Sequence, residues 1–141
     1  MDDAVAHAGP ALARLAGASL FITGGTGFIG RWLLAVLARA NATRDLGTTI
    51  TVLTRSRAGF ARHYPELESD AAIRCVEGDV RTFDFPAGRF SHVIHGATDT
   101  SVEADRQPLQ LIDTIVNGTR RVLEFASAAG AQRVLLLSSG A

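Results

Sequence analysis

The segment that decides the fold spans residues 20–30 and reads LFITGGTGFIG. Its apolar first part stops abruptly at a cluster of glycines. A helical pattern then begins, and one face of it would carry Phe28, Ile29, Trp32, Leu33, Val36 and Leu37. This succession of patterns predicts a buried strand, a tight turn and an amphipathic helix.

The three regularly spaced glycines of this turn each suit a different task. Gly24 lets the backbone turn sharply out of the strand, Gly27 leaves room for a pyrophosphate at the main chain, and Gly30 lets the helix lie close to the strand. Amide groups of the first helical turn and the positive end of the helix dipole would then face the phosphates. A glycine-rich turn can also be only a turn. The strand before it, the helix after it and the three-residue spacing favour nucleotide binding.

The composition narrows the class of protein. The 141 residues suffice for one domain with a core, and 47% of them are apolar, as in a globular chain. A net charge of zero without a basic block argues against nucleic acid and membrane surfaces as partners. No apolar run approaches the roughly 18 residues that span a bilayer. The single cysteine, Cys75, can form no internal disulfide, which suits the cytoplasm. The four histidines lack metal-ligand spacing, which argues against a metal site.

The rest of the chain alternates strand and helix patterns. We expect residues 1–18 to be a loose leader with room for a short helix at 11–15, and residues 19–141 to be the folded part. Strands are predicted at 20–22, 48–53, 73–76, 92–95 and 133–137; helices are predicted from 28 to about 40, at 58–63, and from Pro108 to Gly130. A polar loop is predicted at 41–47.

Strands that alternate with helices predict right-handed crossovers and therefore a parallel sheet with helices on both faces. The predicted fold is a doubly wound α/β sheet, Rossmann-like, with strand order 3-2-1-4-5 and truncated after strand 5. A ligand of such a sheet lies at the carboxyl ends of the strands, here across the switch point between strands 1 and 4.

Residues 23–30, TGGTGFIG, resemble the cofactor fingerprint of the extended short-chain dehydrogenase/reductases, which include nucleotide-sugar epimerases, dehydratases and reductases. The family's spacing is Gly-x-x-Gly-x-x-Gly. The resemblance recurs at four later points and spans the chain from about Ser19 to Ala141. It implies an NAD(P) cofactor held by the fingerprint residues Gly24, Gly27, Phe28, Ile29 and Gly30.

The end of the second predicted strand bears on the choice of cofactor. An NAD-binding chain usually has an acidic residue there, but this one reads Leu53-Thr54-Arg55-Ser56-Arg57, and Thr54 falls about where the family's aspartate stands. A guanidinium can clamp a 2′-phosphate, so Arg55, with Ser56 beside it, favours NADP over NAD. Alternatively, the two arginines are ordinary solvated charges.

Two further strand ends resemble family segments. Asp79 and Val80 match a Gly-Asp-Val turn, which implies that Asp79 accepts a hydrogen bond from the adenine amino group and that Val80 lines the adenine pocket. Gly96, Ala97 and Thr98 match a segment whose small residues pass close to the pyrophosphate and the nicotinamide ribose. The preceding histidine, His95, is expected to face the interior as a structural residue.

The end of the chain resembles the family's fifth strand, where a second serine or threonine contacts the substrate. Ser139 is therefore the catalytic candidate, and the alternative is a serine that only satisfies backbone groups at the strand end. The family's Tyr-x-x-x-Lys pair is absent, since Tyr64 is the only tyrosine and there is no lysine. We interpret the chain as the amino-terminal part of a longer enzyme, and we expect strand 5 to expose apolar surface without its following helix.

Three functions remain open. The first is the cofactor-binding part of an epimerase, dehydratase or reductase that acts on nucleotide sugars, with a homodimer as a possible assembly. The second is an NADP(H)-dependent reductase of the same superfamily that acts on a non-sugar carbonyl, which Arg55 favours. The third is a non-catalytic dinucleotide-binding module, which the missing tyrosine and lysine favour. One sequence position departs from the family pattern: Ile115 stands where an asparagine is common, so that residue's role is not transferred.

Overall fold

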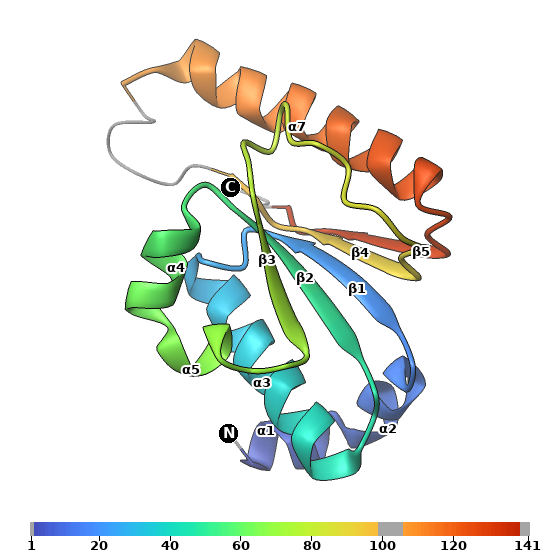
Figure 1. The fold of residues 1–141 in the computed structure, drawn as a ribbon. Coiled ribbons are helices and arrows are strands. Elements are labelled where there is room, and N and C mark those ends of the chain that lie inside the picture. The colour runs from blue at the N-terminus through green and yellow to red at the C-terminus, as the bar shows by residue number, and fades with distance from the viewer. Residues whose placement is uncertain (1, 99–105, 139–141) are drawn as a thin grey trace.

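The computed structural model describes residues 2–98 and 106–138, so Ser139 lies outside the described residues. Five parallel strands form one sheet in the order β3-β2-β1-β4-β5, which confirms the predicted topology (Figure 1). The strands are β1 (Ser19–Thr23), β2 (Thr49–Thr54), β3 (Ile73–Glu77), β4 (His92–His95) and β5 (Arg133–Leu136). The helices are α1 (Asp2–His7), α2 (Gly9–Leu12), the 3-10 helix η1 (Ala13–Leu15), α3 (Phe28–Arg44), α4 (Arg57–His63), α5 (Pro65–Glu68) and α7 (Pro108–Ala128).

The sheet separates two cores, because successive strand residues point to opposite faces. Helices α3, α4 and α5 cover one face, and α7 covers the other (Figure 1). On β1, Leu20 and Ile22 pack into the first core, whereas Phe21 packs into the second. All three of these side chains are buried, so β1 is the central strand in packing as well as in order.

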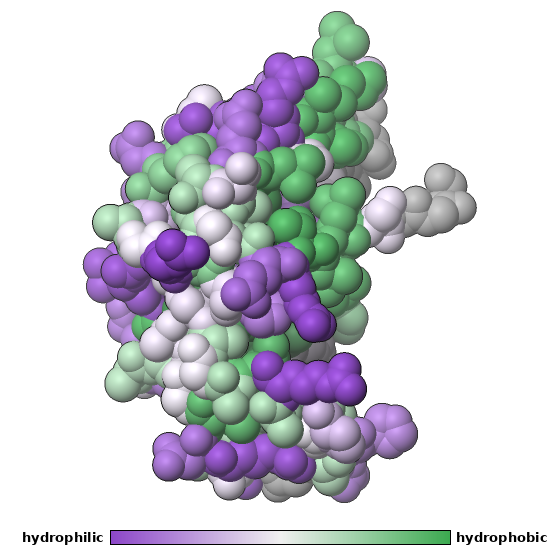
Figure 2. All heavy atoms as spheres, turned by 90° about the vertical axis from the view of Figure 1, so that its right-hand side faces the viewer, coloured by the Kyte–Doolittle hydropathy of each residue, from purple (hydrophilic) through white to green (hydrophobic). Residues whose placement is uncertain are grey.

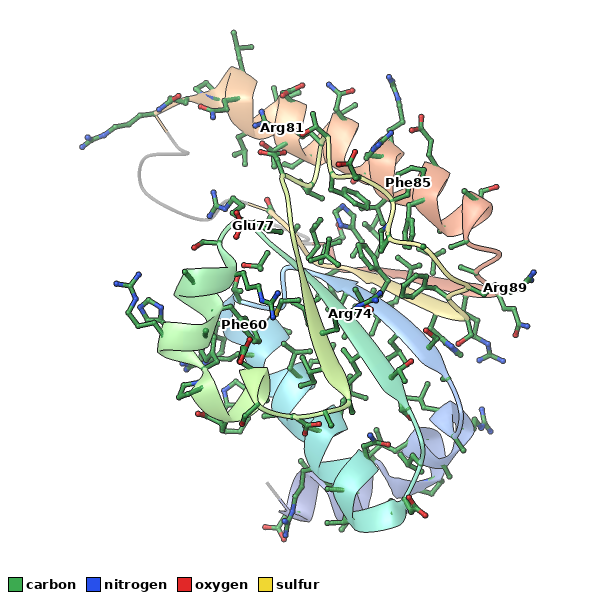
Figure 3. The ribbon with its side chains drawn as sticks, viewed as in Figure 1. Phe60, Arg74, Glu77, Arg81, Phe85 and Arg89 are labelled. Carbon is green, nitrogen blue, oxygen red and sulfur yellow. The ribbon has the colours of Figure 1, made fainter. Side chains whose placement is uncertain are left out.

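The second core is built on phenylalanines, and it fixes the long connection between β3 and β4. Phe21 and Phe125 have ring centroids 4.4 Å apart, and Phe83 lies 5.5 Å from Phe21. Arg121 of α7 donates to the Phe83 carbonyl and stacks on Phe85, with its guanidinium carbon 4.1 Å from the ring centroid (Figure 3). These contacts hold the segment after β3 against α7, which positions residues 78–81 at the edge of the sheet.

Residues 2–18 are packed against the domain, contrary to the expectation of a loose leader. Val5 and Leu12 are buried against the core beneath α3. Arg44, at the end of α3, donates to the Val5 carbonyl, and Thr48 donates its hydroxyl to the Leu15 carbonyl at 2.8 Å. This small helical unit lies at the amino ends of β1 and β2, and therefore at the opposite end of the sheet from the predicted site.

The buried face of α3 differs from the predicted one. Of the predicted face, Leu37 is buried and Leu33 and Val36 are partly buried against the core, but Phe28, Ile29 and Trp32 are 72%, 64% and 51% exposed. The other buried residues of the helix are Gly30, Leu34 and Ala40. A Cβ atom at Gly30 would collide with the Gly24 carbonyl and with the Cα atom of Gly25. Gly30 must therefore face the turn. Since each helical residue rotates by about 100°, its neighbours Phe28, Ile29 and Trp32 then point away from the sheet.

One helix boundary differs from the prediction, and one short helix was not predicted. Helix α3 runs to Arg44 instead of ending near residue 40, and the Asn41 side chain bonds both the N–H and the carbonyl of Thr48, which joins the end of the helix to the residue before β2. Pro65 starts the short helix α5 after the predicted one at 58–63, and its missing N–H is harmless in the first turn.

The β5 side of the molecule exposes apolar side chains, as expected. Val134, Leu135 and Leu136 are between 43% and 53% exposed. Figure 2 looks onto this side and shows hydrophobic residues gathered along one border of it. Exposed apolar residues of α7 are Leu109, Ile112, Ile115, Val116 and Leu123.

Candidate functional site

A cleft of about 520 Å³ opens at the carboxyl ends of β1 to β4, within the size range of small-ligand sites. Its position at the switch point between β1 and β4 agrees with the sequence analysis. The predicted cofactor residues that line it are Gly24, Gly27, Arg55, Asp79, Val80, Gly96, Ala97 and Thr98. The predicted residues Phe28, Ile29, Gly30 and Ser56 are outside the lining, and Ser139 lies outside the described residues.

The floor of the cleft is a close approach between two backbones. Gly24 has a φ of +75°, and a Cβ atom there would collide with the backbone of Gly96 and Ala97. Gly27 is the N-cap of α3, and a Cβ atom there would meet only the Gly24 carbonyl oxygen, at 3.4 Å. Gly24 is therefore required by the fold, whereas Gly27 leaves space that opens into the cleft.

The amino end of α3 provides the anion-binding chemistry that the glycine turn predicts. The amides of Phe28, Ile29 and Gly30 lie in the first turn, where N–H groups have no acceptor within the helix. No acidic side chain occupies this turn. The side chains of Phe28 and Ile29 point out of the cleft, so their contribution to binding an anion is through the main chain.

Sequence reasoning missed two supports of this turn. A Cβ atom at Gly25 would lie 2.8 Å from the Val52 side chain and 3.1 Å from that of Leu34, so this glycine lets the turn sit on the core. Tyr64 donates its hydroxyl to the Thr26 carbonyl at 3.2 Å, across 38 residues of sequence. The paired Gly24-Gly25 was a signal for the first support, but no local pattern indicated the second.

At the end of β2, only one of the two arginines faces the cleft. Thr54 is buried, and its hydroxyl exchanges hydrogen bonds with the backbone of Ser56. Ser56 caps α4 by accepting from the Gly59 N–H at 3.0 Å. Arg57 lies 3.5 Å from Glu68 in an ion pair, whereas Arg55 lines the cleft.

At the end of β3, Asp79 and Val80 lie on the cleft wall. Arg81 donates to Asp79 through its backbone N–H, Nε and Nη2, each at 2.8 Å. The side-chain hydrogen bonds from Arg81 lower the pKa of Asp79 to about 2. A Cβ atom at Gly118 would lie 2.9 Å from Val80, so this glycine lets α7 approach the wall closely.

At the end of β4, His95 is a buried link between the sheet and α7. Thr23 Oγ1 accepts from the Ala97 N–H at 3.2 Å and lies 2.7 Å from His95 Nδ1. On the other side of the ring, Nε2 lies 3.1 Å from Thr119 Oγ1, so each ring nitrogen of His95 is hydrogen-bonded to a threonine hydroxyl. Burial lowers the pKa of His95, so the ring stays neutral and holds the backbone of Gly96 and Ala97 in place. The geometry gives it the structural role expected from the sequence.

The cleft also has a wall that the sequence did not indicate. Helix periodicity predicted α7 but not that its first turns would overhang the switch point. The residues contributed from this wall are Gln107, Gln110, Leu111 and Thr114.

Other reactive groups lie outside the cleft. Burial raises the pKa of Cys75, which keeps its thiol protonated. Within residues 2–98 and 106–138, no cluster of His, Cys, Asp or Glu side chains could hold a metal ion. No helix in the described part of the chain is both long enough and apolar enough to cross a membrane.

Comparison with known proteins agrees with the fold. The sequence profile of the NAD dependent epimerase/dehydratase family matches residues 20–141, and the chain belongs to this family. UDP-glucose 4-epimerase 2 of Oryza sativa subsp. japonica is 30% identical over 136 residues, which cover 87% of this chain and 31% of the epimerase.

Two solved structures are similar over most of this chain. The first is the dTDP-glucose 4,6-dehydratase DesIV of Streptomyces venezuelae, solved with NAD bound. It is 29% identical with a TM-score of 0.65, and the match covers 82% of this chain and 38% of the dehydratase. The second is the UDP-glucose-4-epimerase of Stenotrophomonas maltophila, solved with NAD and formylated UDP-arabinopyranose. It is 22% identical with a TM-score of 0.64, and the match covers 87% of this chain and 37% of the epimerase. The chain thus spans about a third of the length of these relatives.

The buried histidine predicts a pH dependence of stability. Because burial lowers the pKa of His95 below 6.5, the unfolded chain binds this proton at a higher pH than the folded chain. The free energy of unfolding should therefore fall as the pH falls below 6.5, by at most about 1.4 kcal/mol per pH unit for one proton. Asp79 and Asp113 have pKa values below 3.8, so their own contributions are lost only at lower pH.

Urea denaturation between pH 6.5 and 3.8 measures this effect, with His95→Gln as the control that cannot titrate. The control should have a smaller slope over this range. Equal slopes for the two proteins would mean that His95 takes up its proton at the same pH in the folded and the unfolded chain, and would contradict the lowered pKa.

Proposed function

We propose that this chain is the cofactor-binding part of an NAD(P)-dependent epimerase or dehydratase that acts on nucleotide sugars. The observation that carries the proposal is the cleft at the switch point, where the free amides of α3 meet Asp79 and Arg55 from neighbouring strand ends. A dinucleotide needs these features together: an anion site for the pyrophosphate, flanked by groups that can hold an adenosine.

The residues divide the cleft into three parts. The turn at Gly24 and Gly27 would hold the pyrophosphate against the amides of α3. The adenosine half would lie against Asp79, Val80 and Arg55. Its N–H and O–H groups can donate to the Asp79 carboxylate, and its ring offers apolar surface to Val80. Gly96, Ala97 and Thr98 would border the nicotinamide half, toward the end of β5. When bound, the nicotinamide supplies hydride transfer.

The nucleotide-sugar substrate is supported by the relatives. Two of them are UDP-glucose epimerases and one is a dTDP-glucose dehydratase. Ser139, which follows β5 in the sequence, is the residue that would contact the substrate oxygen. The remaining two-thirds of such a protein would supply the catalytic tyrosine and lysine and the sugar-binding surface.

Arg55 favours a second candidate, an NADP(H)-dependent reductase of a non-sugar carbonyl. A guanidinium beside the adenosine ribose suits a 2′-phosphate. The two solved structures named above contain NAD, so the proposed preference for NADP rests on Arg55. Assays of the complete natural protein with nucleotide-diphosphate sugars and with small carbonyl compounds separate the two candidates. Redox-neutral conversion of a sugar supports the first, and net oxidation of NADPH by a non-sugar carbonyl supports the second.

Gly27→Val tests the cofactor cleft. The backbone of Gly27 has φ −76° and ψ 174°, which valine adopts readily, and only one atom lies near its Cβ position, so the variant should fold. Its branched side chain would occupy the space proposed for the pyrophosphate and weaken dinucleotide binding by about tenfold or more, or about 1.4 kcal/mol.

Calorimetric titration with NAD(H) and NADP(H) measures the change in the complete natural protein. Ala42→Val is the matched control, because it adds a valine to an exposed position of the same helix far from the cleft. Binding that is unchanged in Gly27→Val would rule out the pyrophosphate assignment.

Arg55→Ala tests the choice of cofactor. Loss of a charge-assisted hydrogen bond to a 2′-phosphate costs about 1.5–3 kcal/mol, so NADP(H) affinity should fall by about tenfold or more while NAD(H) affinity changes less. Arg57→Ala is the control, since Arg57 pairs with Glu68 and does not line the cleft. Equal weakening of both cofactors by Arg55→Ala would show that this residue does not read the phosphate.

A further inference from the structure

Asp79 does not stand alone on the cleft wall, because one arginine holds its carboxylate in place. The backbone N–H and Nε of Arg81 both donate to Oδ1, and Nη2 donates to Oδ2. The two side-chain bonds form a fork on the two carboxylate oxygens, the arrangement that fixes the plane of a carboxylate. The orientation of Asp79 is therefore set before any ligand binds.

The same guanidinium is fixed from its other side. Arg81 Nη1 lies 2.9 Å from Asp113 Oδ2 on α7, and Asn117 donates to the other oxygen of Asp113. Figure 3 shows Arg81 between the end of β3 and α7. The chain of contacts Asp79–Arg81–Asp113–Asn117 thus joins the cleft wall to the helix that overhangs it.

The exposure of the Asp79–Arg81 ion pair indicates how it contributes to the structure. The side chains of Arg81 and Asp79 are 29% and 36% exposed, and pairs of this exposure contribute little to stability unless they are bidentate or form networks. This pair is both bidentate and part of a network, so it can hold the carboxylate of Asp79 in one orientation. Hydrogen bonds from Arg81 also keep Asp79 ionised, since they lower its pKa to about 2.

Counting acceptor positions shows what remains for a ligand. A carboxylate has about four lone-pair positions. Arg81 fills two on Oδ1 and one on Oδ2, which leaves one position on Oδ2. An ionised carboxylate accepts only, so a ligand must present an N–H or O–H donor there. The neighbouring lining residues Leu53, Val80 and Leu111 are apolar and suit the faces of a ring.

We propose that Arg81 is a positioning residue that turns Asp79 into a single-acceptor reader of the exocyclic amino group of adenine. This inference rests on the proposed dinucleotide function and adds the residue that sets its base specificity. A purine with an amino group at this position donates to the remaining lone pair of Oδ2. A purine with a carbonyl oxygen there places an acceptor against a fixed negative charge and is rejected.

The test compares NAD with nicotinamide hypoxanthine dinucleotide, in which a carbonyl replaces the amino group and the adjacent ring nitrogen N1 carries a proton. Calorimetry on the complete natural protein should give the wild type a preference for NAD of about tenfold or more, the value of one hydrogen bond to a charged group. In Arg81→Met the carboxylate can rotate and be rehydrated, and the preference should fall to near parity. Arg81→Lys, which keeps the charge but cannot form the fork, should behave likewise and is the variant expected to remain folded.

Asp113→Asn is the matched control, because it weakens the contact with α7 and leaves the fork on Asp79 intact. It should keep the preference for NAD. If Asp113→Asn loses the preference as Arg81→Lys does, the tether to α7 and not the fork sets it, and the inference is overturned.

The remaining outcomes separate this inference from the proposed function. A wild type that binds NAD and the hypoxanthine analogue equally, or an Arg81→Lys variant that keeps the full preference, would overturn the role of Arg81 and leave the dinucleotide site standing. A wild type that binds neither ligand would overturn the proposed function and this inference with it.

Discussion

The close approach of two backbones, at Gly24 and Gly96, is the constraint on which the rest of the structure depends. β1 and β4 are neighbours, and the chains that leave them diverge to opposite faces of the sheet. The turn after β1 can pass over the end of β4 only because Gly24 has a positive φ and no Cβ atom. Gly30 then lets α3 start directly on this turn, so that its free amides face the cleft. The anion site follows from this geometry without any charged side chain.

Polar links to helices hold the other strand ends around this turn. His95 connects Thr23 of β1 to Thr119 of α7 through two hydrogen bonds, and Arg81 connects Asp79 to Asp113 of the same helix. The buried contacts of His95 are costly to break, because a partner left behind would be buried without a hydrogen bond. The partly exposed fork of Arg81 instead fixes the orientation of the Asp79 carboxylate. Helix α7 therefore does more than cover the second core: it fixes both sides of the cleft.

Much of this could be predicted from the sequence, because the governing patterns are local. Short apolar runs separated by helical periods determine a parallel sheet, and the chirality of crossovers limits its order. Eight of the proposed cofactor residues follow strand ends directly, so the topology alone brings them into one cleft. The leader had a local signal too: Val5, Ala8 and Leu12 lie at helical spacing, and Val5 and Leu12 are buried.

The features that could not be predicted depend on the rotation of α3 about its own axis and on contacts between residues far apart in the sequence. Apolar character placed Phe28, Ile29 and Trp32 on the buried face of α3, but the contact of Gly30 with the turn rotates them outward. Tyr64 with Thr26, and Arg81 with Asp113, join residues 38 and 32 positions apart, and no sequence spacing indicates such pairs. The overhang of α7 depends in the same way on how Gly118 and Val80 pack.

The most direct test of the account is a crystal structure of the complete natural protein with its bound dinucleotide. The account predicts the pyrophosphate at the amides of Phe28, Ile29 and Gly30, with the adenine amino group at Asp79 and the nicotinamide toward the end of β5. A dinucleotide bound elsewhere, or one in this cleft whose phosphates do not contact the first turn of α3, would contradict the central claim.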